Sequence, residues 1–345
     1  MGKYFGVYWK GKFGRFARLG YGFKFSPWIF QSLTRVVANS VNIELQREAI
    51  VVYLDDFLVM GSTKEECELA RDLLLKTLLH LGLKINKEKS MLEPSQKVVF
   101  LGKIWNLEDG LVEDTLTSLK KTREHCQECL RTKFPTGKEL QKLLGRIEWL
   151  ALTRPFSRCW KTALIEEMKI RLQLNRSDFP MSKESKKELL WWIKNTRNSL
   201  SLRLSHSSYY CTEIHSDASG LAYASTSGVW GCWKDTEIDW NILIKETEAL
   251  RRTICSLEKG KNYVVKIDNY ALFWSLKKGR SRSREVNLIL RRIGGDLQKR
   301  DLHVDFEWIS TKENQADFAS RSLKKLKTRI HKEIKKQEGE GLKES

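Results

Sequence analysis

The sequence contains no apolar run long enough to cross a membrane, so we expect no membrane-spanning segment and no membrane partner. Met1 and Gly2 are not followed by the Ser or Thr of a myristoylation signal, which leaves a cytoplasmic or nuclear location as the expectation. The seven cysteines are odd in number and scattered, which favours reduced thiols over a disulfide framework. Cys126 and Cys129 have zinc-like spacing, but no second Cys or His pair lies at a useful distance.

Acidic residues are few in this sequence relative to basic ones. No Asp or Glu occurs before Glu44, and over the whole chain 62 Lys and Arg outnumber 43 Asp and Glu, for a net charge of +19. The resulting pI near 9.6 suits a polyphosphate partner such as a nucleic acid. A length of 345 residues allows about two or three domains with sizeable apolar cores.

Two adjacent carboxylates interrupt an otherwise apolar run at residues 50–61. The Val, Ile, Tyr and Phe residues on either side predict a hairpin with Asp55 and Asp56 at its tip. Asp tolerates turn geometry, yet Asp-Asp sets like charges side by side where Asn-Gly or Asp-Gly is favoured. Two interpretations stay open at this point: a simple turn, or ligands for Mg²⁺, which is held through one or two carboxylates plus substrate phosphates.

The remaining pattern alternates between helix and strand signals. Ser26 and Pro27 predict the start of a helix, and Ser62 or Thr63 caps a second helix that ends at Gly82. Residues 83–86 and 98–105 each read as a strand, and residues 115–204 are mainly helical. Trp residues at helical spacing in that stretch are expected in the core rather than as base-stacking platforms: Trp149, Trp160, Trp191 and Trp192.

Beyond a polar linker at 205–210, strands and helices alternate as in a second α/β unit. Asp217 and Asp268 stand at the ends of expected strands, Glu246 lies on an expected helix, and Asp317 follows the last strand. A single surface acid is usually solvated, but acids at strand ends lie where open α/β sheets place their ligands. Clustered carboxylates can hold two metal ions about 4 Å apart that activate water against a phosphodiester. The pattern therefore predicts hydrolysis.

In this order the motifs resemble the reverse transcriptase and ribonuclease H region of retrotransposon pol proteins, of the gypsy-like and especially the DIRS-like type, up to about residue 321. Residues 53–56 match the Y-x-D-D palm hairpin, and residues 19–31 resemble the preceding L-P-x-G-x-x-x-S-P-x-x-F loop, with Gly20 in place of Pro. Residues 81–90 resemble the next palm motif and residues 100–102 the primer-gripping hairpin. The four acids of the second unit fall one by one on the D-E-D-D positions of ribonuclease H: Asp217, Glu246, Asp268 and Asp317.

The resemblance implies an α+β and α/β fold class with a partial reverse transcriptase palm over 1–108, a helical thumb or connection over 109–205, a ribonuclease H-like domain over 210–322 and a basic tail over 323–345. It also implies substrate-binding residues in the palm: Tyr21, Lys24, Tyr53 and Lys89. Family polymerases bring a further metal-binding Asp from a strand upstream of the loop at Leu19, where this sequence has no acid. We therefore expect an incomplete polymerase module.

The leading hypothesis is Mg²⁺- or Mn²⁺-dependent cleavage of RNA in an RNA–DNA hybrid by the four C-terminal acids, with Asp55 and Asp56 as part of a polymerase metal site. A second hypothesis is a piece of a longer pol polyprotein that polymerises DNA on a template–primer when a missing upstream segment is present. A third is a non-catalytic nucleic-acid-binding relic. No protease or integrase region is expected, and the oligomeric state stays open.

Overall fold

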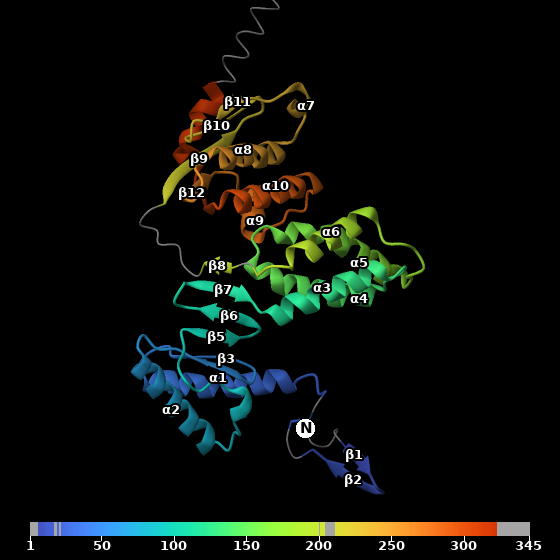
Figure 1. Ribbon diagram of the computed structural model, residues 1–345, viewed down its shortest axis with the longest axis vertical. Coiled ribbons are helices and arrows are strands. Elements are labelled where there is room, and N and C mark those ends of the chain that lie inside the picture. Colours follow the sequence, from blue (N-terminus) through green and yellow to red (C-terminus); the bar gives the residue numbers. More distant parts are fainter. Residues whose placement is uncertain (1–5, 17–18, 21, 200, 204–210, 323–345) are drawn as a thin grey trace, which may run out of the picture. The chain divides into compact units, whose positions relative to one another are not determined.

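The structure is a computed structural model that describes residues 6–16, 19–20, 22–199, 201–203 and 211–322 (Figure 1). The expected linker at 205–210 and basic tail at 323–345 lie outside these residues. The chain divides into two compact units, Met1–Gly110 and Leu111–Ser345. Within the described ranges, every helix is too short or too polar to cross a membrane.

The first unit packs two helices beside a short hairpin. Its elements are β1 (Gly6–Trp9), β2 (Lys12–Arg15), α1 (Ser26–Glu44), β3 (Ile50–Tyr53), β4 (Asp56–Val59), α2 (Lys64–His80), the 3-10 helix η2 (Lys87–Lys89), β5 (Lys97–Phe100) and β6 (Lys103–Asn106). Pro27 lies in the first turn of α1, and the Thr63 hydroxyl accepts from the Glu66 amide to cap α2, as the sequence predicts. Apolar side chains of α1, α2 and β3 form the core, with Val41 and Ile50 almost fully buried.

Two strand predictions in this unit are wrong. Residues 83–86 join no ladder among the described residues, although Leu83 and Ile85 still pack on the core of α1 and α2. Residues 98–105 form a hairpin of β5 and β6 instead of one strand. The chain reverses at Leu101 and Gly102, which both have positive φ, a conformation that glycine favours.

The second unit begins with a helical layer. Its elements are β7 (Leu111–Asp114), α3 (Leu116–Arg131), α4 (Gly137–Leu150), the 3-10 helices η3 (Ala151–Thr153) and η4 (Ser157–Lys161), α5 (Thr162–Leu174), α6 (Lys183–Asn195) and β8 (Ser201–Arg203), which pairs with β7. The tryptophan prediction is confirmed for Trp192, which is fully buried and donates from Nε1 to the Trp160 carbonyl at 2.7 Å. Trp160 stacks on Trp191 with ring centroids 5.0 Å apart, whereas Trp149 stays 37 % exposed.

A five-stranded sheet follows in the same unit. Its elements are β9 (Thr212–Ala218), β10 (Ala222–Ser225), β11 (Trp230–Cys232), α7 (Asp235–Ile238), α8 (Ile242–Ser256), β12 (Asn262–Ile267), α9 (Tyr270–Lys278), α10 (Arg284–Arg300), β13 (His303–Trp308) and the 3-10 helix η6 (Thr311–Glu313), before a helical segment at 315–322. The strand order is β11-β10-β9-β12-β13. The pairs β11/β10 and β10/β9 are antiparallel, while β9/β12 and β12/β13 are parallel. The mixed α+β and α/β fold class is thereby confirmed.

The core of this sheet includes residues from the helical layer. Phe156 belongs to the same apolar cluster as the sheet and meets Phe306 edge to face at 6.1 Å. Gly294 of α10 makes this approach feasible, because a Cβ there would lie 2.9 Å from the Phe156 Cβ. Arg291 of α10 donates to the buried Glu188 carboxylate of α6 at 2.6 Å and lies over the Trp160 ring. The helical layer and the sheet are therefore joined by both apolar and ionic contacts.

Candidate functional site

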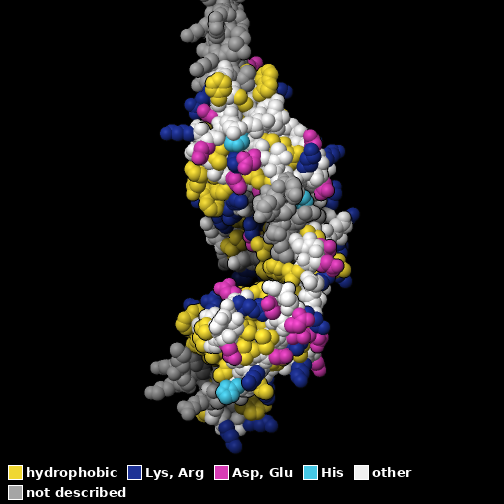
Figure 2. All heavy atoms as spheres, turned by 90° about the vertical axis from the view of Figure 1, so that its left-hand side faces the viewer, with side chains coloured by type: hydrophobic (Ala, Val, Ile, Leu, Met, Phe, Trp, Pro, Cys, Tyr) yellow, Lys and Arg dark blue, Asp and Glu magenta, His cyan; other side chains and the backbone are white. Residues whose placement is uncertain are grey.

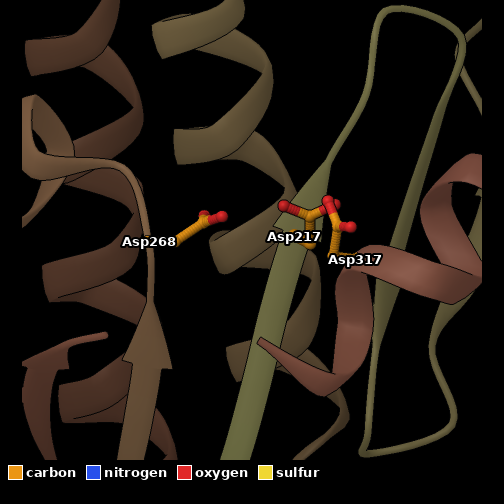
Figure 3. Close-up of side chains that lie close together, drawn as sticks. All are labelled: Asp217, Asp268 and Asp317. Carbon is orange, nitrogen blue, oxygen red and sulfur yellow. The ribbon is translucent and has the colours of Figure 1, made fainter. Parts of the chain in front are cut away.

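Three acidic side chains from separate elements converge at one edge of the five-stranded sheet. Asp217 lies near the end of β9, Asp268 directly follows β12, and Asp317 lies on the helical segment at 315–322. One carboxylate oxygen from each lies within 4.8 Å of the others. Figure 3 shows the carboxylates of Asp217 and Asp317 side by side, with Asp268 directed toward them from the neighbouring strand. The parallel pairing of β9 and β12 explains this meeting, because parallel strands bring their carboxyl ends to the same edge.

Glu246, the fourth predicted acid, lies on α8 and outside this group of three. Its side chain is almost fully buried and its carboxylate accepts a hydrogen bond from the Ala218 backbone, which places it alongside β9. Burial raises the pKa of Glu246 well above the usual value, and the charges of Asp217 and Asp268 raise it further.

The electrostatics of the three aspartates favour a bound cation. Burial raises the pKa of Asp217, and repulsion from Asp268 and Asp317 adds to this rise, whereas a hydrogen bond from Ser320 opposes it. Arg321 forms an ion pair with Asp317 at 2.8 Å, but its side chain is 62 % exposed, so solvent screens much of its charge. The donor set consists of carboxylate oxygens, the ligands that Mg²⁺ and Mn²⁺ prefer. The residues present therefore fit a divalent cation.

Hydrogen bonds attach the Asp317 segment to β9. The Asn314 amide donates to the Ser216 carbonyl at 3.3 Å, and the Gln315 backbone amide donates to His215 Nδ1 at 3.2 Å. Ser320 donates to the Asp217 carboxylate. Neither Ser320 nor Asn314 stands out in the sequence, because no local pattern marks a side chain whose partner lies about a hundred residues away in the chain.

The other predicted metal ligands, Asp55 and Asp56, lie at the tip of the β3–β4 hairpin. Leu54 and Asp55 form the turn, Leu54 has a φ of 54°, and Asp56 pairs with Tyr53. Gln31 of α1 supports this tip by accepting from the Leu54 amide at 2.5 Å. Both carboxylates are exposed, and no third metal-ligating side chain joins them within the described part of the chain.

The predicted substrate-binding residues of the palm lie on its surface where they are described. Tyr53 is 55 % exposed on β3, Lys89 is exposed in η2, and Lys24 is exposed with its ammonium 5.6 Å from the Phe25 ring centroid. Tyr21 lies outside the described residues. Their role in substrate binding stays a prediction.

Residues 4–104 match the family described as "Reverse transcriptase (RNA-dependent DNA polymerase)". The chain is 32 % identical over 137 residues to the Gag-Pro-Pol polyprotein of Human T-cell leukemia virus 2 and 26 % identical over 137 residues to that of Human T-cell leukemia virus 3 (strain 2026ND). Each match spans 40 % of this chain and only 9 % of the polyprotein.

Among solved structures, the foamy viral protease-reverse transcriptase in complex with double-stranded DNA aligns over 89 % of this chain and 63 % of its own, with 20 % identity and a TM-score of 0.46. The same viral protein in complex with an RNA/DNA hybrid aligns over 88 % of this chain and 40 % of its own, with 18 % identity and a TM-score of 0.44.

Proposed function

Because this chain carries a retroelement reverse transcriptase region, with the family match at residues 4–104, we propose that its second unit cleaves the RNA strand of RNA–DNA hybrids with the help of a divalent metal ion. The observation that carries the proposal is the meeting of Asp217, Asp268 and Asp317, whose carboxylate oxygens come from three separate elements to within 4.8 Å. Such a cluster destabilises a fold unless a cation offsets its charge, so its assembly at a sheet edge points to a metal site.

The reaction is hydrolysis. Water forms a bond to phosphorus, the bond from phosphorus to a ribose oxygen breaks, and the two ends leave as a phosphate monoester and a hydroxyl. A bound Mg²⁺ or Mn²⁺ would supply polarisation of the phosphate and a more acidic water. The three aspartates would hold the cation, and the carboxylate of Glu246, on the neighbouring helix α8 that packs against β9, would accept the proton of the attacking water.

Substrate selection follows from shape and charge. The net charge of +19 attracts a nucleic acid duplex, and this attraction weakens steeply with salt. On the face shown in Figure 2, Lys and Arg side chains are dispersed among acidic and apolar ones. Contacts with the 2′-hydroxyl and with the duplex shape would distinguish RNA from DNA.

The test uses the purified full chain and an RNA–DNA hybrid whose RNA strand is labelled. We expect cleavage of the RNA with Mg²⁺ or Mn²⁺, no cleavage of the matching DNA duplex, and a loss of at least ~100-fold in Asp217→Asn, because charge stabilisation of this kind typically contributes that much. Asp301→Asn is the matched control: it makes the same charge change at the exposed C-terminal end of α10, where the backbone has a φ of 50° that Asn tolerates. Equal cleavage by wild type and Asp217→Asn, or none with either metal, would show the proposal to be wrong.

RNA-directed DNA polymerisation is a second candidate, favoured by the family match over the palm. The transferred phosphoryl group needs its developing charge neutralised, and Asp55 and Asp56 form only two parts of such a site among the described residues. We therefore propose that this chain extends a primer only when a longer pol polypeptide supplies a further carboxylate. Primer extension by the purified chain alone, abolished in Asp55→Asn, would overturn this view.

A further inference from the structure

We propose that Ser320 is a positioning residue of the acid site, which orients the Asp217 carboxylate toward the metal. This inference rests on the proposed metal site and assigns a role to a residue outside the acid set. Ser320 is fully buried, and its hydroxyl donates to Asp217 Oδ2. The Asp317 carbonyl lies 3.1 Å from the same hydroxyl and competes for its proton. A serine has only one O–H to donate, and the carboxylate is the stronger acceptor, so the bond to Asp217 prevails.

Ser320 also takes part in the hydrogen-bonded contact between the helical segment at 315–322 and the end of β9. The Ser320 carbonyl accepts from the hydroxyl of Ser219, which directly follows β9, at 3.2 Å. The Ser219 carbonyl in turn accepts from the indole nitrogen of the buried Trp233 at 3.0 Å. Together with the bonds to His215 and Ser216 described above, these contacts attach the Asp317 segment along the end of β9. Asp217 is therefore held from the side that faces this segment.

The Ser320 hydroxyl opposes a rotation of Asp217 that repulsion between like charges favours. Asp217 and Asp317 repel one another when both are ionised, and rotation of the Asp217 side chain would relieve this repulsion by breaking up the ligand set. By donating to Oδ2, Ser320 occupies one carboxylate oxygen and opposes that rotation. Groups that orient metal ligands in this way typically contribute 10–100-fold (roughly) in metal affinity. Loss of the hydroxyl should thus weaken metal binding without changing contacts to the nucleic acid.

The experiment measures binding of Mn²⁺ to the full chain by calorimetry at constant ionic strength, in the absence of nucleic acid. We expect Ser320→Ala to raise the Kd for Mn²⁺ about 10–100-fold and Ser320→Thr, which restores a hydroxyl, to bind more tightly than Ser320→Ala. Ser310→Ala is the matched control, because the Ser310 hydroxyl bonds to Glu313 and to none of the site acids. Its Kd should equal that of wild type.

A double-mutant cycle separates positioning from general damage to the fold. In the Asp217→Asn background, Ser320→Ala should cause little further loss of Mn²⁺ affinity, because its partner has already lost its charge. Melting of the metal-free proteins shows whether each variant folds. Should Ser320→Ala not fold, Ser320→Cys replaces it, keeps a weak donor of similar size, and should bind Mn²⁺ more weakly than wild type.

The outcomes distinguish this inference from the proposed function. Equal Mn²⁺ affinity of wild type and Ser320→Ala overturns the role of Ser320, even when both cleave hybrids. An equal loss in the Asp217→Asn background overturns it as well. A third outcome is that Mn²⁺ binding depends on Ser320 but wild type cleaves no hybrid. This result supports the role of Ser320 and overturns the proposed function instead.

Discussion

Replacement of Glu246 by Gln should stabilise the metal-free protein while it abolishes cleavage. Glu246 is only 6 % exposed and lies close enough to Asp217 and Asp268 for their charges to raise its pKa. Gln can still accept from the Ala218 amide but carries no charge. A buried ionisable group without a compensating partner costs on the order of 1–3 kcal/mol. For a unit of this size, that corresponds to a melting temperature roughly 2–12 °C higher in Glu246→Gln at neutral pH.

The pH dependence of this gain has a definite sign. The pKa of Glu246 is raised in the folded protein, so the stability that its protonation contributes is fully present below the ordinary value of 4.5 and is lost as the pH rises through the folded value. The gap between Glu246→Gln and wild type should therefore widen from about pH 4.5 upward. Addition of Mg²⁺ should narrow it, because the cation offsets the same repulsion and stabilises wild type by mass action.

The assay is thermal melting followed by circular dichroism between pH 4.5 and pH 8, in EDTA and again in Mg²⁺. Glu307→Gln serves as the control, because it removes a carboxylate from an exposed position on β13 of the same sheet. Its melting curves should follow those of wild type. A metal-free Glu246→Gln protein that is no more stable than wild type at neutral pH would show that burial and charge repulsion do not destabilise the ionised Glu246.

The remaining predictions concern the junction of the helical layer with the sheet, and the cysteines. Arg291→Ala leaves the fully buried Glu188 carboxylate without its cation and should lower the free energy of unfolding by about 3–5 kcal/mol. Replacement of the exposed Arg292 on the same helix by Ala should have little effect, and equal denaturation midpoints for the two variants would contradict this. In the native protein, Ellman's reagent should label the exposed Cys232 but neither Cys129 nor Cys159, because burial raises the pKa of Cys129 to about 11 and that of Cys159 to about 12. Rapid labelling of Cys129 or Cys159 before unfolding would contradict their burial.

The palm hairpin and the sheet acids illustrate what local pattern can predict. Asp55 and Asp56 interrupt an apolar run, so both the strands and the tip follow from the sequence. Asp217 lies one residue before the end of β9 and Asp268 directly follows β12, and parallel pairing then brings them to one edge. Burial determines the rest: the sequence shows that Glu246 lies on a helix, but only the packing of α8 against β9 and β10 explains its raised pKa.

The failures have physical causes of the same kind. Residues 83–86 have strand-like composition, but a strand requires a partner, and the chain offers none there within the described ranges. The strand β10 consists of Ala, Tyr, Ala and Ser, a composition too weak to signal a strand, and it forms because β9 and β11 flank it. The role of Ser320 cannot be recognised from the sequence, because it depends on a contact with Asp217 that only the folded sheet creates.

The most direct test of the central claim compares one acid of the sheet with the two acids of the palm hairpin in one assay. Cleavage of a labelled RNA–DNA hybrid is measured in Mg²⁺ and in Mn²⁺ for wild type, for Asp268→Asn, and for the double variant Asp55→Asn/Asp56→Asn. We predict that wild type and the double palm variant cleave at similar rates, whereas Asp268→Asn loses at least ~100-fold in cleavage rate. Cleavage that survives in Asp268→Asn but disappears in the palm variant would contradict the assignment of the chemistry to the C-terminal acids.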